Sequence, residues 1–139
     1  MPAIELTEEN SPQLAERFGG FEDAVIVGTH IHSPLPPKDG RSLTVDITAA
    51  DATDGHTWRL VRFTLDGLTA YRFVLGEAYS YYVLSDGLKL DCSPTGCLLD
   101  LDPGPDTWFP EQVQQEGEYS KQYAIGARCA YEIIGGPLT

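Results

Sequence analysis

Carboxylates and aromatic rings are concentrated in one interval of this chain, between Lys89 and Lys121, where no basic residue occurs. Exposed carboxylates attract a cationic partner from a distance, and rigid rings supply contact area once the partner has arrived. This combination predicts a surface that binds a basic protein rather than a catalytic centre. The residues that we expect to form it are Asp100, Asp102, Asp106, Trp108 and Phe109.

Two groups of residues have the chemistry of metal ligands, and the first lies within the acidic interval. The run from Asp100 to Asp106 loosely resembles a calcium loop, but it lacks the oxygen ligand before glycine and the bidentate Glu of an EF-hand. His30 and His32 would project to the same side of a strand, yet a zinc site needs further ligands that the sequence does not place. We therefore expect an acidic loop, two surface histidines, and no metal or other cofactor.

The three cysteines are Cys92, Cys97 and Cys129, an odd number that favours reduced thiols. Cys92 and Cys97 flank the turn-forming sequence Ser-Pro-Thr-Gly, so a disulfide across a hairpin is geometrically conceivable. The favoured interpretation is that all three are small hydrophobic residues in strands.

The sequence contains neither a Gly-x-Ser-x-Gly elbow nor a glycine-rich phosphate loop. Because 21 residues are acidic, some close pair of carboxylates is inevitable and carries no information about hydrolysis. We therefore lean towards a non-enzymatic protein. The alternative is a small-ligand-binding or hydrolytic β-barrel, whose aromatic-lined pocket would contain Trp58, Arg62, Tyr71 and Phe73.

Four Asp-Gly dipeptides divide the middle of the chain, at residues 39–40, 54–55, 66–67 and 86–87. Asp-Gly supplies the positive φ of a tight hairpin turn, so this spacing predicts an antiparallel meander. A short helix should begin at Ser11-Pro12 and end at Gly19-Gly20. We expect strands at 24–31, 43–48, 58–65, 68–75, 81–84, 88–92, 97–101 and 123–133.

The turn at Asp66-Gly67 should close the best-defined hairpin, with Leu65 opposite Leu68 and Phe63 opposite Ala70. Both faces of this hairpin are apolar, so we expect it near the centre of a sheet. A second hairpin should form about residues 86–87, and the last strand should bend near Gly126.

A chain of 139 residues suits one domain, residues 1–139, with a core of its own. The predicted fold is α+β and strand-dominated: a short N-terminal helix with a strongly bent antiparallel sheet, or a partly closed barrel, of six to eight strands. A sandwich of two sheets is the alternative.

The chain carries 21 acidic against nine basic residues, a formal net charge of -12. This charge disfavours nucleic-acid phosphates and anionic membranes as partners, and it leaves basic proteins or metal cations. The first ten residues lack the basic and apolar regions of a signal peptide, and no apolar run reaches the roughly 18 residues of a membrane span. We therefore expect a cytoplasmic protein.

The segment from Phe18 to Ile26, Phe-Gly-Gly-Phe-Glu-Asp-Ala-Val-Ile, followed by strands and by the stretch from Phe63 to Tyr71, resembles the opening of small bacterial β-rich proteins. These include immunity proteins of polymorphic toxin systems. The resemblance implies a cytoplasmic, mainly β protein that neutralises a toxin by binding it. It assigns no functional residue.

Overall fold

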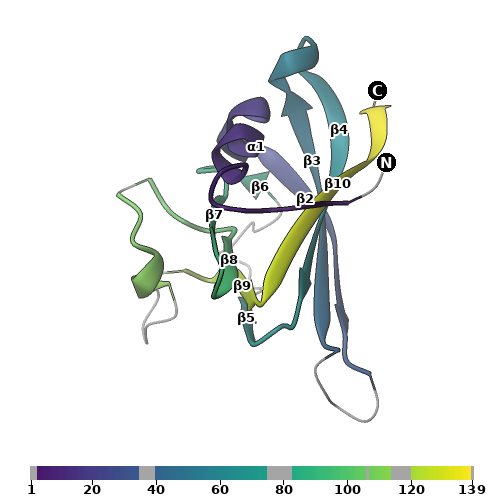
Figure 1. Ribbon diagram of the computed structural model, residues 1–139. Coiled ribbons are helices and arrows are strands. Elements are labelled where there is room, and N and C mark those ends of the chain that lie inside the picture. Colours follow the sequence, from purple (N-terminus) through teal and green to yellow (C-terminus); the bar gives the residue numbers. More distant parts are fainter. Residues whose placement is uncertain (1–2, 35–39, 75–82, 106, 114–119, 139) are drawn as a thin grey trace.

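The fold is dominated by β-strands, with one short α-helix near the N-terminus (Figure 1). The computed structural model describes residues 3–34, 40–74, 83–105, 107–113 and 120–138. Their strands form two open antiparallel sheets, one of six strands and one of four. The predicted strand-dominated fold with a short N-terminal helix is thus confirmed, and its strands are divided between two sheets.

The larger sheet has the strand order β1, β10, β4, β3, β2, β6. Phe63 of β4 lies between Val45 of β3 and Tyr131 of β10. Every second residue of β3 from Leu43 to Ala49 is fully buried, as expected for a sheet with one face on the core. The bounds of these strands are β1 (Ile4–Glu5), β2 (Ala24–His32), β3 (Ser42–Asp51), β4 (Thr57–Asp66), β6 (Val83–Leu84) and β10 (Arg128–Leu138).

The smaller sheet consists of β5 (Ala70–Phe73), β9 (Gln122–Gly126), β8 (Gly96–Asp100) and β7 (Lys89–Ser93), in that spatial order. Buried residues of both sheets, among them Phe63 and Leu99, form one continuous apolar core. A second, smaller cluster contains Leu98, Val113 and Tyr123, beside the 3-10 helix η3 (Pro110–Gln112).

The helix α1 (Ser11–Arg17) begins with Pro12 in its first turn, where a missing backbone donor costs nothing. It is followed by the 3-10 turn η1 (Gly19–Phe21), in which Gly20 has a φ of 69°. The Phe21 ring lies 5.1 Å from Phe18 and 5.6 Å from Phe63, centroid to centroid. These rings fasten the helical segment to the larger sheet, and the predicted helix is confirmed.

The turn at residues 54–55 is a hairpin connection, in agreement with the meander expected from the Asp-Gly spacing. β3 and β4 pair from Ser42 with Asp66 to Asp51 with Thr57, and the 3-10 turn η2 (Ala52–Asp54) joins them. Gly55 has a φ of 61°, which a glycine adopts without strain.

The predicted hairpin about Asp66-Gly67 is wrong. Gly67 does have a positive φ of 62°, but β4 pairs with β3 and β10, and β5 pairs with β9 in the other sheet. The predicted pairs of Leu65 with Leu68 and of Phe63 with Ala70 are therefore not formed. Because β10 already occupies the second edge of β4, the chain leaves this sheet at Gly67 and enters the smaller one.

The predicted hairpin about Asp86-Gly87 is also wrong, since β6 pairs with β2 and β7 pairs with β8. The turn instead docks on η1, where the Leu88 amide donates to the Gly20 carbonyl at 3.2 Å. Tyr81 and Tyr82 of the predicted strand lie outside the described residues.

The predicted last strand is divided at Ala127 into β9 and β10, directly after the expected bend at Gly126. The chain passes there from the smaller sheet to the larger one. Within the described ranges, no helix is long and apolar enough to cross a membrane.

Candidate functional site

Asp100, the first residue of the predicted partner-binding surface, is fully buried at the end of β8. Its carboxylate accepts hydrogen bonds from Trp108 Nε1 at 2.9 Å, Ser120 Oγ at 2.6 Å and the Asp102 amide at 2.9 Å. The prediction that Asp100 belongs to an exposed partner-binding surface is therefore wrong. β8 is an inner strand of its sheet, and the protein itself supplies these three donors to the buried carboxylate.

The other predicted surface residues lie in different environments. Trp108 is half-buried, packs against the cluster around Val113 and holds its loop to Asp100. Phe109 is 44% exposed, and Asp102 is half-buried. Asp106 lies outside the described residues. The aromatic and acidic side chains thus do not form one continuous exposed surface in the described part of this loop.

The four residues of the alternative pocket are not brought together. Trp58 and Arg62 belong to β4 in the larger sheet, whereas Tyr71 and Phe73 belong to β5 in the smaller one. Arg62 binds Asp46 at 2.8 and 3.0 Å, which raises the pKa of Arg62, and it lines a different depression from Tyr71. The prediction of a common pocket is wrong because it depended on a hairpin between β4 and β5.

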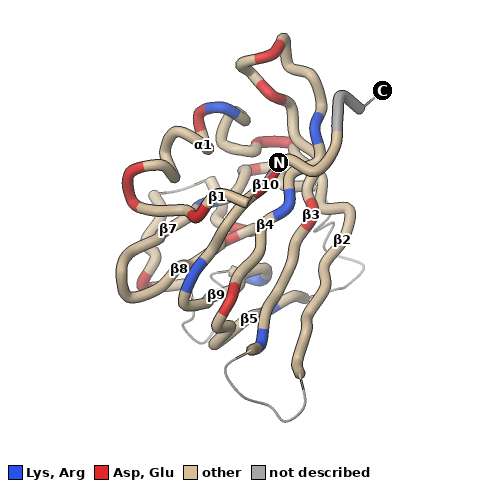
Figure 2. The backbone as a smooth tube through the Cα atoms, turned by 45° about the vertical axis from the view of Figure 1, so that its right-hand side comes forward, with Lys and Arg blue, Asp and Glu red and all other residues tan. Residues whose placement is uncertain are grey.

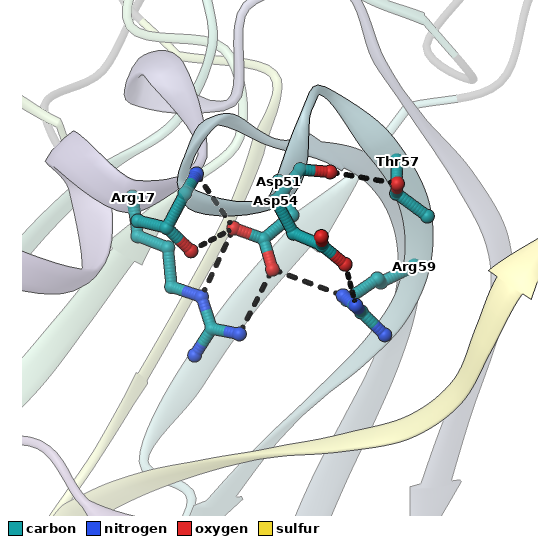
Figure 3. A network of polar contacts seen from close by, with 6 residues as sticks. Arg17, Asp51, Asp54, Thr57 and Arg59 are labelled. Carbon is teal, nitrogen blue, oxygen red and sulfur yellow. Dashed lines mark hydrogen bonds and ion pairs between the residues drawn. The ribbon is translucent and has the colours of Figure 1, made fainter.

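A buried carboxylate that sequence reasoning missed, Asp51, lies at the end of β3 (Figure 3). It accepts hydrogen bonds from Arg17 of α1, at 3.2 and 2.9 Å, and from Arg59 Nε of β4 at 2.9 Å. The Thr53 amide and hydroxyl donate to the same carboxylate, at 3.0 and 2.6 Å. Arg59 also pairs with the exposed Asp54.

This Asp51 network connects the helix to the β3–β4 hairpin. The hydrogen bonds from Arg17 hold the pKa of Asp51 far below its usual range, and Asp51 in turn raises the pKa of Arg17. Because the carboxylate is fully buried and accepts five hydrogen bonds, it has no capacity left for a substrate. Its role is structural.

The histidines and cysteines give no metal site in the described part of the chain, where no group of three potential ligands is present. His30 and His32 are exposed on β2. All three cysteines are buried and free, as predicted, and Cys92 lies directly opposite Cys97 across β7 and β8. Burial raises the pKa of Cys92 and Cys129, so these thiols are poor nucleophiles at neutral pH.

Three depressions adjoin one another. The first is lined in part by the N-terminal segment, the second by α1 and β7, and the third by residues 83–87, 101–103, 121 and 122. The first two share Glu8. Gly87, which lines the third, lies against the carbonyl of Gly20, which lines the second. We call their acidic lining the acidic seam. It consists of Glu5, Glu8, Glu9, Asp86, Asp91 and Asp102.

The seam has an excess of negative charge at its surface. All of its carboxylates except the half-buried Asp102 are exposed. Among the described residues, the cations that line the same depressions are Lys89, Lys121 and Arg128, half as many as the carboxylates. Figure 2 shows acidic positions along the N-terminal segment that leads into α1, on the side of the molecule where β7 lies. This arrangement suits contact with a cationic surface.

The third of these depressions, the Gln122 depression, contains a second residue that sequence reasoning missed. Gln122 is 2% exposed, and its Nε2 donates to the Val74 carbonyl at 2.8 Å. Its buried Oε1 finds no hydrogen-bond donor in the described part of the chain. The only local indication in the sequence was a polar amide at the start of an apolar strand. The residues that line the depression include Leu84, Asp86, Leu101, Asp102, Lys121 and Gln122.

The chain matches no protein-family model, no curated protein and no solved structure. The geometry of the acidic seam and of the Gln122 depression therefore carries the functional argument.

Proposed function

We propose that this protein is a non-enzymatic binding protein that engages a basic protein partner through the acidic seam, in the manner of an immunity-like inhibitor. The observation that supports the proposal is the excess of carboxylates over cations along three adjoining depressions. Such an excess steers a basic protein towards this side and disfavours an acidic one.

The charge of the whole chain acts in the same direction. A formal net charge of -12 gives a negative field that speeds the approach of cationic proteins and is screened within about 8 Å at physiological ionic strength. Association with the partner should therefore be fast at low salt and slower at high salt.

The resemblance of the segment from Phe18 to Ile26 to immunity proteins supports the inhibitor class. Part of this segment, η1, lies next to the seam, because Gly20 lines the depression that also contains Glu8 and Asp91. Binding at this side would bring the partner against the segment that carries the resemblance.

The test uses the protein as bait in a lysate of its source cell, at low and at high salt. The seam variant combines Glu8→Gln, Asp86→Asn and Asp91→Asn. The control variant removes the same number of charges elsewhere, with Asp54→Asn, Asp66→Asn and Glu111→Gln, all at exposed positions. Association and dissociation rates are then measured with the purified partner.

We expect a basic partner whose association rate falls about tenfold with the seam variant and changes little with the control variant. The effect should shrink at high salt because the exposed charges are screened. If the recovered partner is a toxic enzyme, inhibition of that enzyme identifies the inhibitor class. Equal association with both variants, or recovery of neutral and acidic partners alone, would contradict the proposal.

A further inference from the structure

Cys92 and Cys97 face each other directly across the hairpin of β7 and β8. Ser93 pairs with Gly96 around a two-residue turn, and Cys92 pairs with Cys97 at the next position. The pair that closes such a turn is hydrogen-bonded, so the next pair is not, and its Cα atoms lie about 4.5 Å apart with both side chains on one face of the sheet. Disulfides join residues whose Cα atoms are about 4.4–6.8 Å apart. The native register therefore suits a bond between the two sulfurs without any change of strand pairing.

The two thiols also influence each other in the folded chain. Burial, and after it the neighbouring Cys97 thiol, raises the pKa of Cys92. Both side chains pack in the main core, and both are free thiols in the structure. They are thus the reduced form of a pair whose partners already stand side by side.

The pair lies at the end of the molecule's smaller sheet where a reagent can reach it. β7 is an edge strand with β8 as its neighbour in the described sheet, and the turn residues Pro94 and Thr95 are exposed. Cys92 is 3% exposed and Cys97 is 4% exposed, each within two residues of this turn. The end of a hairpin on a sheet edge opens at a lower free energy than the centre of a sheet, so small molecules gain access to both sulfurs.

Cys129 differs from the other two cysteines and provides an internal reference. It belongs to β10 of the larger sheet, where its partner across the ladder is Leu65. It is fully buried and free, and burial raises its pKa. The three thiols thus share one core, but only two of them are paired by strand register.

We propose that Cys92 and Cys97 are a redox-active pair, which a hydroperoxide oxidises to a disulfide and a small thiol reduces again. This inference does not depend on the proposed function, because it concerns a modification of the β7–β8 hairpin itself. The disulfide would fix the edge strand β7 to β8.

The oxidation takes place in two steps. The Cys97 sulfur attacks one oxygen of hydrogen peroxide, the O–O bond breaks, and Cys97 becomes a sulfenic acid while one water leaves. We assign this step to Cys97 because burial disfavours the thiolate of Cys92. The Cys92 sulfur then attacks the Cys97 sulfur, and its thiol proton leaves with the hydroxyl group as a second water. In total, two thiols lose two electrons and two protons, and the peroxide is reduced to two waters.

The second step benefits from the native geometry. Holding two reacting groups side by side raises their effective concentration, which offsets the small thiolate fraction of Cys92. Reduction follows by thiol–disulfide exchange: one small thiol forms a mixed disulfide with the pair, and a second one releases it, so that both cysteines regain their protons.

The test treats the folded, reduced full chain with hydrogen peroxide, stops the reaction with acid, and alkylates the remaining thiols in denaturant. Because no Lys or Arg lies between Lys89 and Lys121, trypsin releases Cys92 and Cys97 on one peptide, residues 90–121, and Cys129 on another, residues 129–139. We expect peptide 90–121 to be unalkylated and lighter by two hydrogen atoms, and Cys129 to be alkylated. Dithiothreitol should restore both alkylation sites of peptide 90–121.

The oxidation rates provide the quantitative comparison. The pair should lose its thiols at least about tenfold faster than Cys129 of the same molecules. Cys129→Ala should change the rate of disulfide formation less than about twofold. With Cys92→Ala, the reaction should stop at a sulfenic acid on Cys97, which dimedone traps. Circular dichroism checks that each variant folds, and the wild-type result decides the matter even where a variant does not.

Several outcomes would overturn the inference. One is that all three thiols stay reduced at a peroxide concentration that oxidises added N-acetylcysteine. Others are equal oxidation rates for the pair and for Cys129, or a disulfide that links Cys129 or two chains. A disulfide between Cys92 and Cys97 that forms only in denaturant would also contradict it, because such a bond would not depend on the native register.

Discussion

Asp51 shows how one buried side chain can hold together segments that are far apart in the sequence. Its carboxylate joins Arg17 of the helix to Arg59 of β4, and the local Thr53 donors fix its orientation. An ionised carboxylate is stable inside a protein only when it is paired and hydrogen-bonded in this way. Removing the charge takes this anion from both arginines, although Arg59 keeps its pair with Asp54 and both arginines remain partly exposed to water.

We therefore expect Asp51→Asn to lower the free energy of unfolding by about 2 kcal/mol, measured by urea denaturation at neutral pH. The matched control is Asp54→Asn, which removes a mostly exposed partner of the same Arg59 and should cost less than about 0.5 kcal/mol. Equal losses of unfolding free energy in the two variants would show that the burial of Asp51 adds nothing to its contribution to stability.

The lowered pKa of Asp51 also predicts a dependence on pH. In the unfolded chain the carboxyl titrates near its ordinary pKa of about 3.9, whereas in the folded protein it stays ionised to a lower pH. The stability that it contributes is therefore complete above about pH 5 and is lost as the pH falls below about 4 towards the folded pKa. The measurement is the difference in unfolding free energy between wild type and Asp51→Asn. It should be constant from pH 7 to 5 and shrink below that; a difference that grows on acidification would contradict the assignment.

Sequence reasoning could identify the types of these residues but not their partners. Asp51 and Thr53 show a local capping pattern, yet Arg17 lies 34 positions away, and nothing local connects the two. Asp100 appeared to be one more acid in an acidic loop, and only the fold reveals that Trp108 and Ser120 donate to it. The presence of a carboxylate in the sequence does not show whether the fold will bury it.

The Asp-Gly dipeptides predicted the local backbone conformation well and the strand partners poorly. Positive φ occurs at Gly55, Gly67 and Gly87. Only the first of these closes a hairpin, since β4 already has β3 and β10 on its two edges and the 84–88 turn docks on η1. A turn residue specifies a reversal of the chain, whereas the choice of neighbouring strand depends on which edges other segments have filled.

A pair of glycines separates the effect of backbone conformation from that of packing. Gly55 and Gly87 both have positive φ, but a Cβ at Gly55 meets no atom of the described residues within 4 Å, while a Cβ at Gly87 would overlap the Gly20 carbonyl oxygen. We expect Gly55→Ala to cost about 1 kcal/mol of unfolding free energy and Gly87→Ala about 3 kcal/mol or more. Chemical denaturation of both variants provides the comparison. Similar costs would mean that the turn at 87 moves freely away from η1.

The excess of acidic residues in the whole molecule opposes compactness. With a formal net charge of -12, the exposed carboxylates repel one another in the folded state more than in an extended chain. Added salt screens this repulsion, but it affects the buried Asp51 pairs much less.

We therefore expect the midpoint of thermal unfolding to rise as KCl increases from about 0.01 to 0.2 M, because the Debye length falls from about 30 Å to less than 10 Å. The control is the seam variant with Glu8→Gln, Asp86→Asn and Asp91→Asn, whose formal charge is -12 + 3 = -9. The unfolding midpoint of this variant should rise less with salt than that of the wild type. A midpoint that falls with salt in the wild type would show that attractive surface pairs outweigh the repulsion.

The overall class of the fold could be predicted because it depends on period-two patterning, which is visible residue by residue in β3 and β4. The division into two sheets could not, because it arises from two crossings of the chain, at Gly67 and Ala127, that lie side by side in space. The Gln122 depression also escaped prediction, since segments near residues 86, 102 and 122 meet there only after both sheets have formed.

The position of β10 has a consequence for how the molecule assembles. It is the last strand of the described chain, yet it lies inside the larger sheet, between β1 and β4. Until β10 is in place, β4 has an open edge with unpaired backbone groups, and β1 has no neighbour at all. In a nascent or refolding chain, the backbone groups at this edge of β4 therefore stay unpaired until residues 128–138 have paired with it. We infer that the larger sheet is completed late, through pairing between distant segments, and that its folding is slow for that reason.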